Sequence, residues 1–397
     1  MTDLTPYLNE LATPCYVYDL NEIQERITQL KKDLPANVAV YYAVKANSNL
    51  HLLKALRNNI AGLDLSSGGE YEQAMLAGYE PQNFSFAGPG KTETELEIVL
   101  KSGCGSLSAE SFDDLIRIDT VAQKIKRLAS VSLRINPEKP NEHFAMKMGG
   151  KPTQFGFDEE ELNTLPALKN TAIIGLHIYA GTQSLSAAGL AENFENIFTL
   201  ADKLSKKLKI DLKQLNIGGG FGIDYFTGQE PLDIQAVCSA LSKKAAQYPS
   251  LKIILELGRY LVAPAGYYLC QVLNIKKSRG KTFVIVNGGM HHNQSAAGNL
   301  GQVIKKNYKI TNLSHPKSEK LRVELTGCLC TPLDTLAVNL ELPTPQIGDV
   351  LCIHNSGAYG YTASPLLFLG HPTPPEYLLE NGKIKLIRPS KRLMEFN

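Results

Sequence analysis

Residues 38–44 read VAVYYAV, a short run of mostly apolar side chains that ends just before Lys45. Similar runs recur along the first two-thirds of the chain, with helix-like patterns between them. Continuous apolar strands that alternate with helices indicate a parallel sheet buried on both faces. Eight such units, ending near residue 257, predict a (β/α)₈ barrel, and an open doubly wound sheet is the alternative. The other expected strands are 61–65, 83–88, 105–109, 130–135, 173–179, 214–220 and 252–257.

Polar or glycine residues stand at the end of nearly every one of these strands. The carboxyl ends of barrel strands are where catalytic groups are presented, so this pattern predicts an active site at one mouth of the barrel. The ordinary polarity of loops is the alternative explanation, but it accounts for one or two such positions and not for a whole series in order. The positions are Lys45, Asp64, Gly88, Glu110, Arg134, His177, 218–220, Glu256 and Arg259.

The pattern changes after about residue 262. Strand-like runs such as KTFVIVN and KLRVELTG follow one another between turn residues, with few helical stretches, which is typical of an antiparallel β domain. The strand-like segment CYVYDL (15–20) precedes the barrel and is expected to join that domain. We therefore expect a barrel over 22–262 and a discontinuous β domain from 1–21 and 263–397.

Length and composition limit the class of protein. At about 100–200 residues per domain, 397 residues suggest two domains. Lys plus Arg number 41 against 39 for Asp plus Glu, a net charge of +2, so neither nucleic acid nor a membrane surface is an expected partner. The N-terminus lacks the basic region of a signal peptide, and we expect a cytoplasmic protein.

The seven cysteines are odd in number, so disulfides are not expected. Cys328 and Cys330 are separated by one residue, without a second pair or a pair of histidines at zinc spacing. We therefore expect no metal site.

Two motifs suggest the chemistry. Lys45 leaves an apolar strand in YYAVKANSN, where partial desolvation would make its amine a nucleophile toward aldehydes; a lysine that reaches into solvent is the alternative. The sequence GGGFG (218–222) follows the seventh strand, where barrels often bind phosphate. Ile223 occupies the last glycine position of a dinucleotide fingerprint, so that reading is excluded, and a tight turn is the alternative.

The eighth strand ends in ELGR (256–259). Glu256 could pair with a cationic ring nitrogen, and Arg259 could bind phosphate. His177, at the end of the sixth strand, could stack on a planar cofactor, although a lone histidine is more often structural.

The motifs YYAVKAN, LDLSSGGE, LRINP, QFGF, GGGFG, ELGRY, CTPLD and GAYG occur in one order from about residue 13 to about 380. In this the chain resembles the fold-type III pyridoxal-phosphate decarboxylases, the group of diaminopimelate and ornithine decarboxylases. The resemblance implies pyridoxal 5'-phosphate held by Lys45 as a Schiff base, with His177 stacked on its ring and Glu256 at the ring nitrogen. Further cofactor-binding residues that it implies are Asp64, Arg134, Thr182, Gly219, Gly220, Gly258, Arg259 and Tyr359.

The resemblance also implies a homodimer with shared active sites. Cys330 would come from the partner subunit and protonate the product, and Asp334 and Tyr359 would contact the substrate. A thiol is a plausible acid because its pKa lies near the working pH. A buried core cysteine is the alternative for Cys330.

The chain departs from the main branches of the group. Thr331 and Pro332 stand where diaminopimelate decarboxylases carry Glu-Ser, and the turn 287–289 reads NGG where ornithine-type enzymes carry Asn-Asp-Gly. Acidic residues that could bind a distal ammonium group of the substrate are thus missing at two places. Burial of an ammonium group without a partner costs free energy, so a free diamine or diamino acid fits poorly. GGMHHN (288–293) resembles a smaller branch that acts on citryl-diaminopropionate or on carrier-bound glutamate.

We therefore expect a decarboxylase of an amino acid with a bulky or anionic acyl extension, in siderophore or related metabolism, with a carrier protein as a possible partner. His291 and His292 would suit the distal group of the substrate; an exposed loop pair is the alternative. Diaminopimelate decarboxylase is the second expectation for the function. An alanine racemase-like enzyme, or a non-catalytic binder of the cofactor, are competitors that Glu256 and the β domain oppose.

Overall fold

The computed structural model describes residues 2–138, 143–144, 146–147, 149–298 and 305–396. The chain divides into two compact units. The barrel unit consists of Arg26–Ile223 and Pro231–Gly258, and the β unit of Met1–Glu25, Asp224–Glu230 and Arg259–Asn397. The boundaries expected from the sequence, at 22 and 262, lie within a few residues of these. The return of 224–230 to the β unit has no counterpart in the sequence pattern.

Eight parallel strands close the ring of the barrel unit. Each strand pairs with the next, and the last pairs back with the first through Ile253–Leu257 and Val38–Tyr42. This closure confirms the barrel and excludes the open sheet. The strands are β2 (Val38–Ala43), β3 (Gly62–Leu65), β4 (Phe84–Phe86), β5 (Ser106–Ala109), β6 (Ala129–Asn136), β9 (Thr171–Ile178), β11 (Gln214–Asn216) and β12 (Lys252–Leu257).

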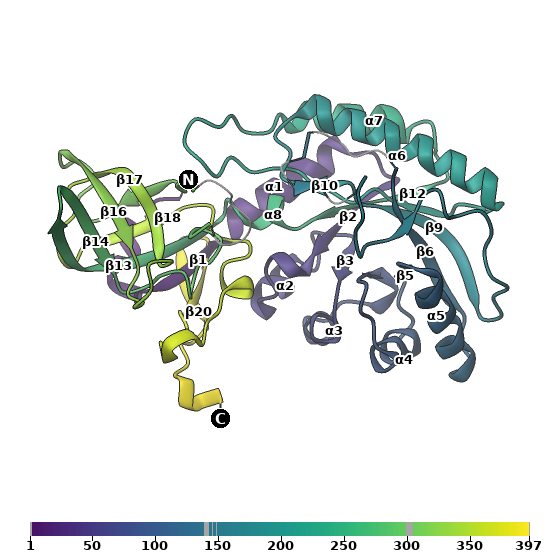
Figure 1. Cartoon of the computed structure of the whole chain (residues 1–397), viewed down its shortest axis with the longest axis horizontal. Helices are drawn as coiled ribbons and strands as arrows, with labels where there is room; N and C mark the ends of the chain where they lie inside the picture. The colour runs from purple at the N-terminus through teal and green to yellow at the C-terminus, as the bar shows by residue number, and fades with distance from the viewer. Residues whose placement is uncertain (1, 139–142, 145, 148, 299–304, 397) are drawn as a thin grey trace. The chain divides into compact units, whose positions relative to one another are not determined.

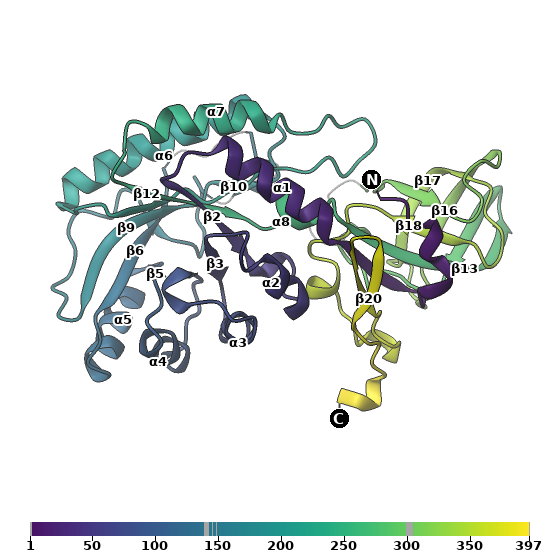
Figure 2. The same cartoon turned by 180° about the vertical axis from the view of Figure 1, so that it is seen from behind.

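Helices follow most of these strands, and Figures 1 and 2 show α6 and α7 side by side, across the strands from α3, α4 and α5. Side-chain caps start them where the sequence has hydroxyl or carboxylate residues: Thr92 and Glu95 form a reciprocal capping box, and Ser111 accepts from the Asp114 backbone N–H. The helices are α1 (Leu20–Asp33), α2 (Leu50–Leu56), α3 (Gly68–Leu76), α4 (Glu93–Lys101), α5 (Phe112–Lys124), α6 (Ala187–Leu208), α7 (Ile234–Ala245) and α8 (Arg259–Val262).

The connection between β6 and β9 departs from the βα pattern. Its described residues contain no helix but carry the short strands β7 (Met146–Lys147) and β8 (Phe157–Asp158). β8 extends the pairing of β6, and β7 pairs with β10 (Gly181–Thr182). One 3₁₀ turn in this unit, η2 (Val44–Ala46), directly follows β2 and carries Lys45.

The β unit is a mostly antiparallel sheet. β1 (Cys15–Asp19) pairs with β13, so the segment before the barrel does join this unit, as predicted. Two pairs are parallel, β1 with β19 and β14 with β16, which the expectation of an antiparallel domain did not include. The other strands are β13 (Gly266–Ser278), β14 (Lys281–Val286), β15 (Ile310–Asn312), β16 (Lys320–Thr326), β17 (Thr335–Pro343), β18 (Val350–Ile353), β19 (Glu376–Glu380) and β20 (Lys383–Arg388).

Buried tyrosines on β1 and β13 form part of the core of the β unit. Tyr16 donates its hydroxyl to the carbonyl of His292 at 2.6 Å, and Tyr18 donates to the Glu376 carboxylate. A buried phenol needs such a partner for its O–H, so these bonds fix the sheet relative to the following loops. Among the described residues, no helix has both the length and the hydropathy to cross a bilayer.

Candidate active site

Lys45 lies in η2 at the end of β2, between the buried Val44 and Ala46. Its amine is 3.9 Å from the Asp64 carboxylate and 5.7 Å from the ring centroid of Tyr179. The side chain is 45% exposed, more than its apolar neighbours in the sequence suggested. Solvent can therefore reach the amine, and the nearest charge to it is a carboxylate.

Asp64, at the end of β3, is almost completely buried. Burial raises the pKa of its carboxyl well above the ordinary value, and the charge of Glu256 adds to that rise. Its Oδ1 has no hydrogen-bond partner among the described residues. The Lys45 amine is thus the positive charge that favours an ionised Asp64.

Glu256 ends β12 in a buried position beside β11 and accepts a hydrogen bond from the side-chain amide of Asn216. Burial opposes ionisation of Glu256, but interactions with His177 and the Lys45 amine and the Asn216 hydrogen bond outweigh it and lower the pKa of the carboxyl. A buried carboxylate that stays ionised can stabilise a cation placed against it. The sequence analysis missed Asn216, although this residue ends β11 (Gln214–Asn216), the strand that pairs with the strand of Glu256.

His177, on β9, lies opposite Asn216 in the register of β9 and β11. Its Nδ1 is 2.9 Å from the Ser108 hydroxyl, and its Nε2 is 3.6 Å from Glu256. Burial lowers the pKa of His177 to about 4, so the ring is neutral at neutral pH. Within the described part of the chain, Nε2 makes no hydrogen bond. A neutral, planar ring held from one edge is suited to stacking.

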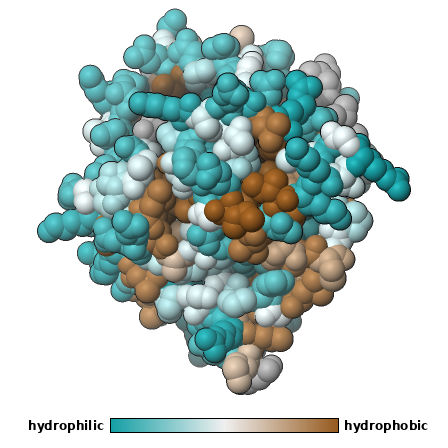
Figure 3. Space-filling model, turned by 90° about the vertical axis from the view of Figure 1, so that its left-hand side faces the viewer, coloured by the Kyte–Doolittle hydropathy of each residue, from teal (hydrophilic) through white to brown (hydrophobic). Residues whose placement is uncertain are grey.

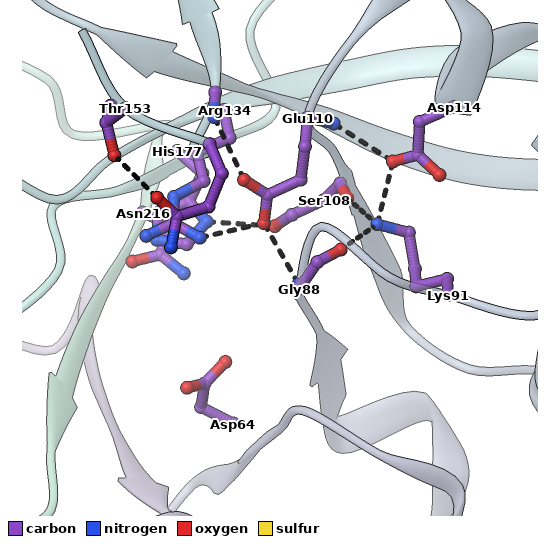
Figure 4. A network of polar contacts seen from close by, with 12 residues as sticks. Asp64, Gly88, Lys91, Ser108, Glu110, Asp114, Arg134, Thr153, His177 and Asn216 are labelled. Carbon is purple, nitrogen blue, oxygen red and sulfur yellow. Dashed lines mark hydrogen bonds and ion pairs between the residues drawn. The ribbon is translucent and has the colours of Figure 1, made fainter.

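A second polar network centres on Glu110, at the end of β5 (Figure 4). Its carboxylate accepts from Arg134 at 2.7 Å and from the backbone N–H groups of Gly88 and Gly156, each at 3.0 Å. The Arg134 guanidinium also lies 4.7 Å from the centroid of the Phe155 ring. Arg134, a predicted cofactor residue, is thus held in place by a carboxylate that the sequence analysis noticed but gave no role.

Nearby, Figure 4 shows Lys91 bound to Asp114, with Asp64 apart from this network. The Lys91 amine lies 2.7 Å from the Asp114 carboxylate and donates to the carbonyl of Ser108 at 2.9 Å. The pair is buried in both members. It fixes the ends of β4 and β5 rather than offering a free charge.

The glycine turn after β11 is tightly packed. A Cβ at Gly219 would overlap the carbonyl oxygen of Glu256, and Gly220 has a φ of +88°. Gly258 faces the Lys45 segment, since a Cβ there would meet the Ala43 carbonyl at 2.9 Å. Gly219 and Gly220 are buried and pack against backbone oxygen atoms of Glu256 and Gly181, so the turn has no room for side chains at these two positions. A turn without side chains is also the kind of segment that binds phosphate through its backbone N–H groups. Thr182 lies half-buried in β10, where it pairs with Met146.

In the β unit, Arg259 is packed between two phenols. It donates to the Tyr225 hydroxyl at 3.2 Å, and its guanidinium carbon lies 4.6 Å from the ring centroid of Tyr359. Tyr359 has a φ of +56°, an unfavourable value for a residue with a side chain. Arg259 and Tyr359 therefore lie together, as expected if both bind the same phosphate group. Tyr225 is a further neighbour of Arg259 that the sequence analysis did not identify.

Asp334 clamps two loops of the β unit. Its carboxylate accepts from the backbone N–H of Met290 at 2.6 Å and from that of Leu329 at 2.8 Å. Gly289 and Gly327 pack so closely on the carboxylate that neither has room for a Cβ. Burial raises the pKa of Asp334, and the two N–H groups act against that rise. The residue expected to contact substrate thus has both oxygens bound to the protein backbone.

The structure excludes the alternatives given above for Cys330, a buried core cysteine, and for His291 and His292, an exposed loop pair. Cys330 is the exposed member of the seven cysteines, all of which are described, so it is not a core residue. His291 and His292 are both buried, so they are not an exposed loop pair. His292 is bonded at both nitrogens, to Tyr268 at 3.2 Å and to the Pro372 carbonyl at 3.0 Å. Among the described residues, His291 has a hydrogen-bond partner at neither nitrogen.

The residues of the barrel unit fit pyridoxal 5'-phosphate. Lys45 carries a primary amine of the kind that its aldehyde requires, and Glu256 is a buried carboxylate of the kind that its ring nitrogen requires. Its phosphate is commonly bound by backbone N–H groups of a glycine-rich turn, and residues 218–220 form such a turn, with positive φ at Gly218 and Gly220. These features define the class of pyridoxal-phosphate enzymes built on a (β/α)₈ barrel.

Comparison with known proteins agrees with this class. Residues 20–263 match the pyridoxal binding domain of the pyridoxal-dependent decarboxylases, and the chain belongs to that family. The chain is 38% identical to the L-glutamyl-[BtrI acyl-carrier protein] decarboxylase of Niallia circulans, over 97% of this chain and 93% of the relative. It is 34% identical to the diaminopimelate decarboxylase of Aquifex aeolicus, over 96% of this chain and 91% of the relative.

A third relative is the 2-[(L-alanin-3-ylcarbamoyl)methyl]-2-hydroxybutanedioate decarboxylase of Staphylococcus aureus, 30% identical over 93% of this chain and 94% of the relative. Among solved structures, the diaminopimelate decarboxylase of Helicobacter pylori in complex with L-lysine superposes with a TM-score of 0.88. It is 30% identical, over 98% of this chain and 97% of that chain. The predicted family, fold and cofactor are thus confirmed, and the chain is a pyridoxal-phosphate-dependent decarboxylase.

Proposed function

We propose that this enzyme decarboxylates an amino acid whose side chain carries a large acyl extension with a neutral or anionic end. One observation carries the proposal. Segments 287–293 and 327–334, both fully described, contain a single acidic residue, Asp334. Both of its carboxylate oxygens are bound to backbone N–H groups. Neither segment therefore offers a free carboxylate to a distal ammonium, whose burial without a partner would cost several kcal/mol.

The names of two relatives support this substrate class. One acts on a glutamyl group attached to an acyl-carrier protein, and another on a hydroxybutanedioate joined to alanine through a carbamoyl link. Both substrates are amino acids already extended by an acyl or carrier group. Diaminopimelate decarboxylases are also among the relatives, so decarboxylation of diaminopimelate is the alternative function.

Bound pyridoxal phosphate supplies an electron-withdrawing ring that takes up the electron pair left when carbon dioxide departs. Lys45 would hold the cofactor through its amine, and Asp64, 3.9 Å away, would exchange the proton of that amine. Glu256, kept ionised beside Asn216, would stabilise a protonated ring nitrogen. His177, neutral and fixed by Ser108, would support the ring without adding a positive charge that would compete with the ring nitrogen for Glu256.

Cys330 would return a proton to the product. Its side chain is exposed, and a thiol can donate a proton near neutral pH. Arg259, between Tyr225 and Tyr359, would bind an anionic group of the cofactor.

A panel of substrates tests the function. Carbon dioxide release would be measured with carrier-bound glutamate, citryl-diaminopropionate, meso-diaminopimelate and ornithine at equal concentrations. We expect kcat/KM for one of the two extended substrates to exceed that for the free diamino acids by at least about 10²-fold, because a site lacking the partner of a polar group rejects the group strongly. Efficient turnover of free diaminopimelate would refute the argument from Asp334 and the two segments.

The homodimer is part of the proposal. The face drawn in Figure 3 carries apolar patches among hydrophilic surface, and large apolar side chains of the β unit are exposed, among them Leu333, Ile347 and Leu386. Apolar patches of this kind are typical of protein interfaces. If Lys45 of one protomer acts with Cys330 of its partner, mixing the variants Lys45→Ala and Cys330→Ala, each with little activity alone, should restore about a quarter of wild-type activity, since half of the dimers are mixed and each has one intact site. No recovery after subunit exchange would contradict shared sites.

A further inference from the structure

Three side chains of the β unit converge that lie far apart in the sequence: His291, Cys328 and His371. One nitrogen or sulfur atom from each lies within 4.8 Å of the others. The Cys328 sulfur is 3.9 Å from Nε2 of His371, and the rings of His291 and His371 are 5.0 Å apart between centroids. His291 and Cys328 are 37 residues apart in the sequence, and Cys328 and His371 are 43 residues apart. These separations match none of the compact zinc motifs, so the sequence analysis did not connect the three residues.

His291 has an unusual environment within this group. It is fully buried, and neither of its ring nitrogens has a hydrogen-bond partner among the described residues. A neutral imidazole offers one donor and one acceptor, and a buried polar side chain is normally bonded. The adjacent His292 obeys that rule at both nitrogens, so burial of this loop does not by itself prevent bonding. The nitrogens of His291 are therefore available to bind a ligand.

The donor set matches a borderline-soft divalent cation. Imidazole nitrogen and cysteine sulfur are the ligands that Zn²⁺ favours, and two histidines with one cysteine leave a fourth position open. A cysteine binds a cation as the thiolate, so the Cys328 thiol must give up its proton. Formation of the S–Zn bond would break the S–H bond and release that proton to solvent.

The backbone around the cluster fixes the three ligands. Cys328 donates its N–H to the carbonyl of Gly288 at 3.1 Å, and Asp334 binds the same two loops together. The residue after His371, Pro372, accepts a hydrogen bond from His292. The three ligand-bearing segments are thus held together by bonds outside the cluster, which is how metal sites keep their ligands in place.

We propose that His291, Cys328 and His371 bind one Zn²⁺ ion, with a fourth position open to an exogenous ligand. The holoenzyme, first dialysed against a chelator, would be titrated with Zn²⁺ in competition with a chromophoric indicator. We expect one tightly bound ion per chain. The variants Cys328→Ser and His371→Gln should bind it more weakly by at least about 100-fold, since changes outside the ligand shell alone cost 10–100-fold.

Cys330→Ala is the matched control, because it removes the exposed thiol two residues away and leaves the cluster intact. Zinc affinity in that variant should equal that of the wild type. If Cys330→Ala abolishes binding, or if the wild type binds no stoichiometric ion, the proposal is overturned. Should Cys328→Ser fail to fold, His371→Gln at a half-buried position still decides the question. Replacement of Zn²⁺ by Co²⁺ should also give a thiolate-to-metal absorption band that His371→Gln weakens and Cys330→Ala retains.

Discussion

Replacing Asp334 by Asn separates a structural role from a role in binding substrate. The Asp334 carboxylate accepts two backbone hydrogen bonds, from Met290 at 2.6 Å and Leu329 at 2.8 Å, and is buried. Hydrogen bonds to a charged group contribute about 1.5–3 kcal/mol each. The amide of Asn keeps one acceptor oxygen but turns an N–H toward the other donor, so one bond is lost and the other loses its charge. We therefore expect a loss of about 2–4 kcal/mol in the free energy of unfolding.

Urea unfolding of the holoenzyme would measure this loss, and hydrogen exchange would locate it. Amides in 287–293 and 327–334 should exchange faster in Asp334→Asn than in the wild type. Glu341→Gln is the control, because Glu341 is 61% exposed in its pair with Arg322 and its removal should change stability by under about 0.5 kcal/mol. Unchanged stability together with a raised KM would refute the clamp and favour direct contact between Asp334 and substrate.

Three further results are expected. Glu256→Gln should lower kcat by about 10²-fold, as loss of a preorganised charge typically does, with cofactor content unchanged; wild-type kcat would exclude the ring-nitrogen role. Cys330→Ala should lower kcat by about 10²-fold with little change in the absorbance of the bound cofactor, and full activity would assign the proton donor elsewhere. Burial lowers the pKa of His354 to about 4, so the folded state binds its proton less readily than the unfolded state, and stability should fall as pH drops from about 6.5 toward 4. At pH 5 the part of this loss that comes from His354 is about 2 kcal/mol, so in urea unfolding His354→Gln should lose about 2 kcal/mol less than the wild type, while other buried histidines such as His177 keep their share. An identical loss in both proteins would contradict the assignment.

The barrel could be predicted from the sequence because its strands are buried on both faces and therefore read as continuous apolar runs. The expected run 38–44 and the observed strand Val38–Ala43 differ by one residue. The β unit was harder to predict, since half-exposed strands such as Thr335–Pro343 alternate and resemble loops. The parallel pairing of β1 with β19 joins segments about 360 residues apart, and no local pattern encodes such a contact.

The site was predictable where a residue ends a strand, because the barrel brings all strand ends to one mouth. Lys45, His177 and Glu256 were found in this way. Asn216 and Tyr225 were missed because their roles depend on which side chain lies across from them, which is a tertiary property. The cluster of His291, Cys328 and His371 was missed for the same reason, since it is assembled from three separate loops.

Reduction of the holoenzyme with borohydride, followed by peptide mass spectrometry, tests the central claim most directly. The reagent fixes the cofactor to whichever amine holds it. The pyridoxyl group should be found on the peptide that contains Lys45, at about one group per chain. Its absence, or its presence on another lysine instead, would contradict the role assigned to the end of β2.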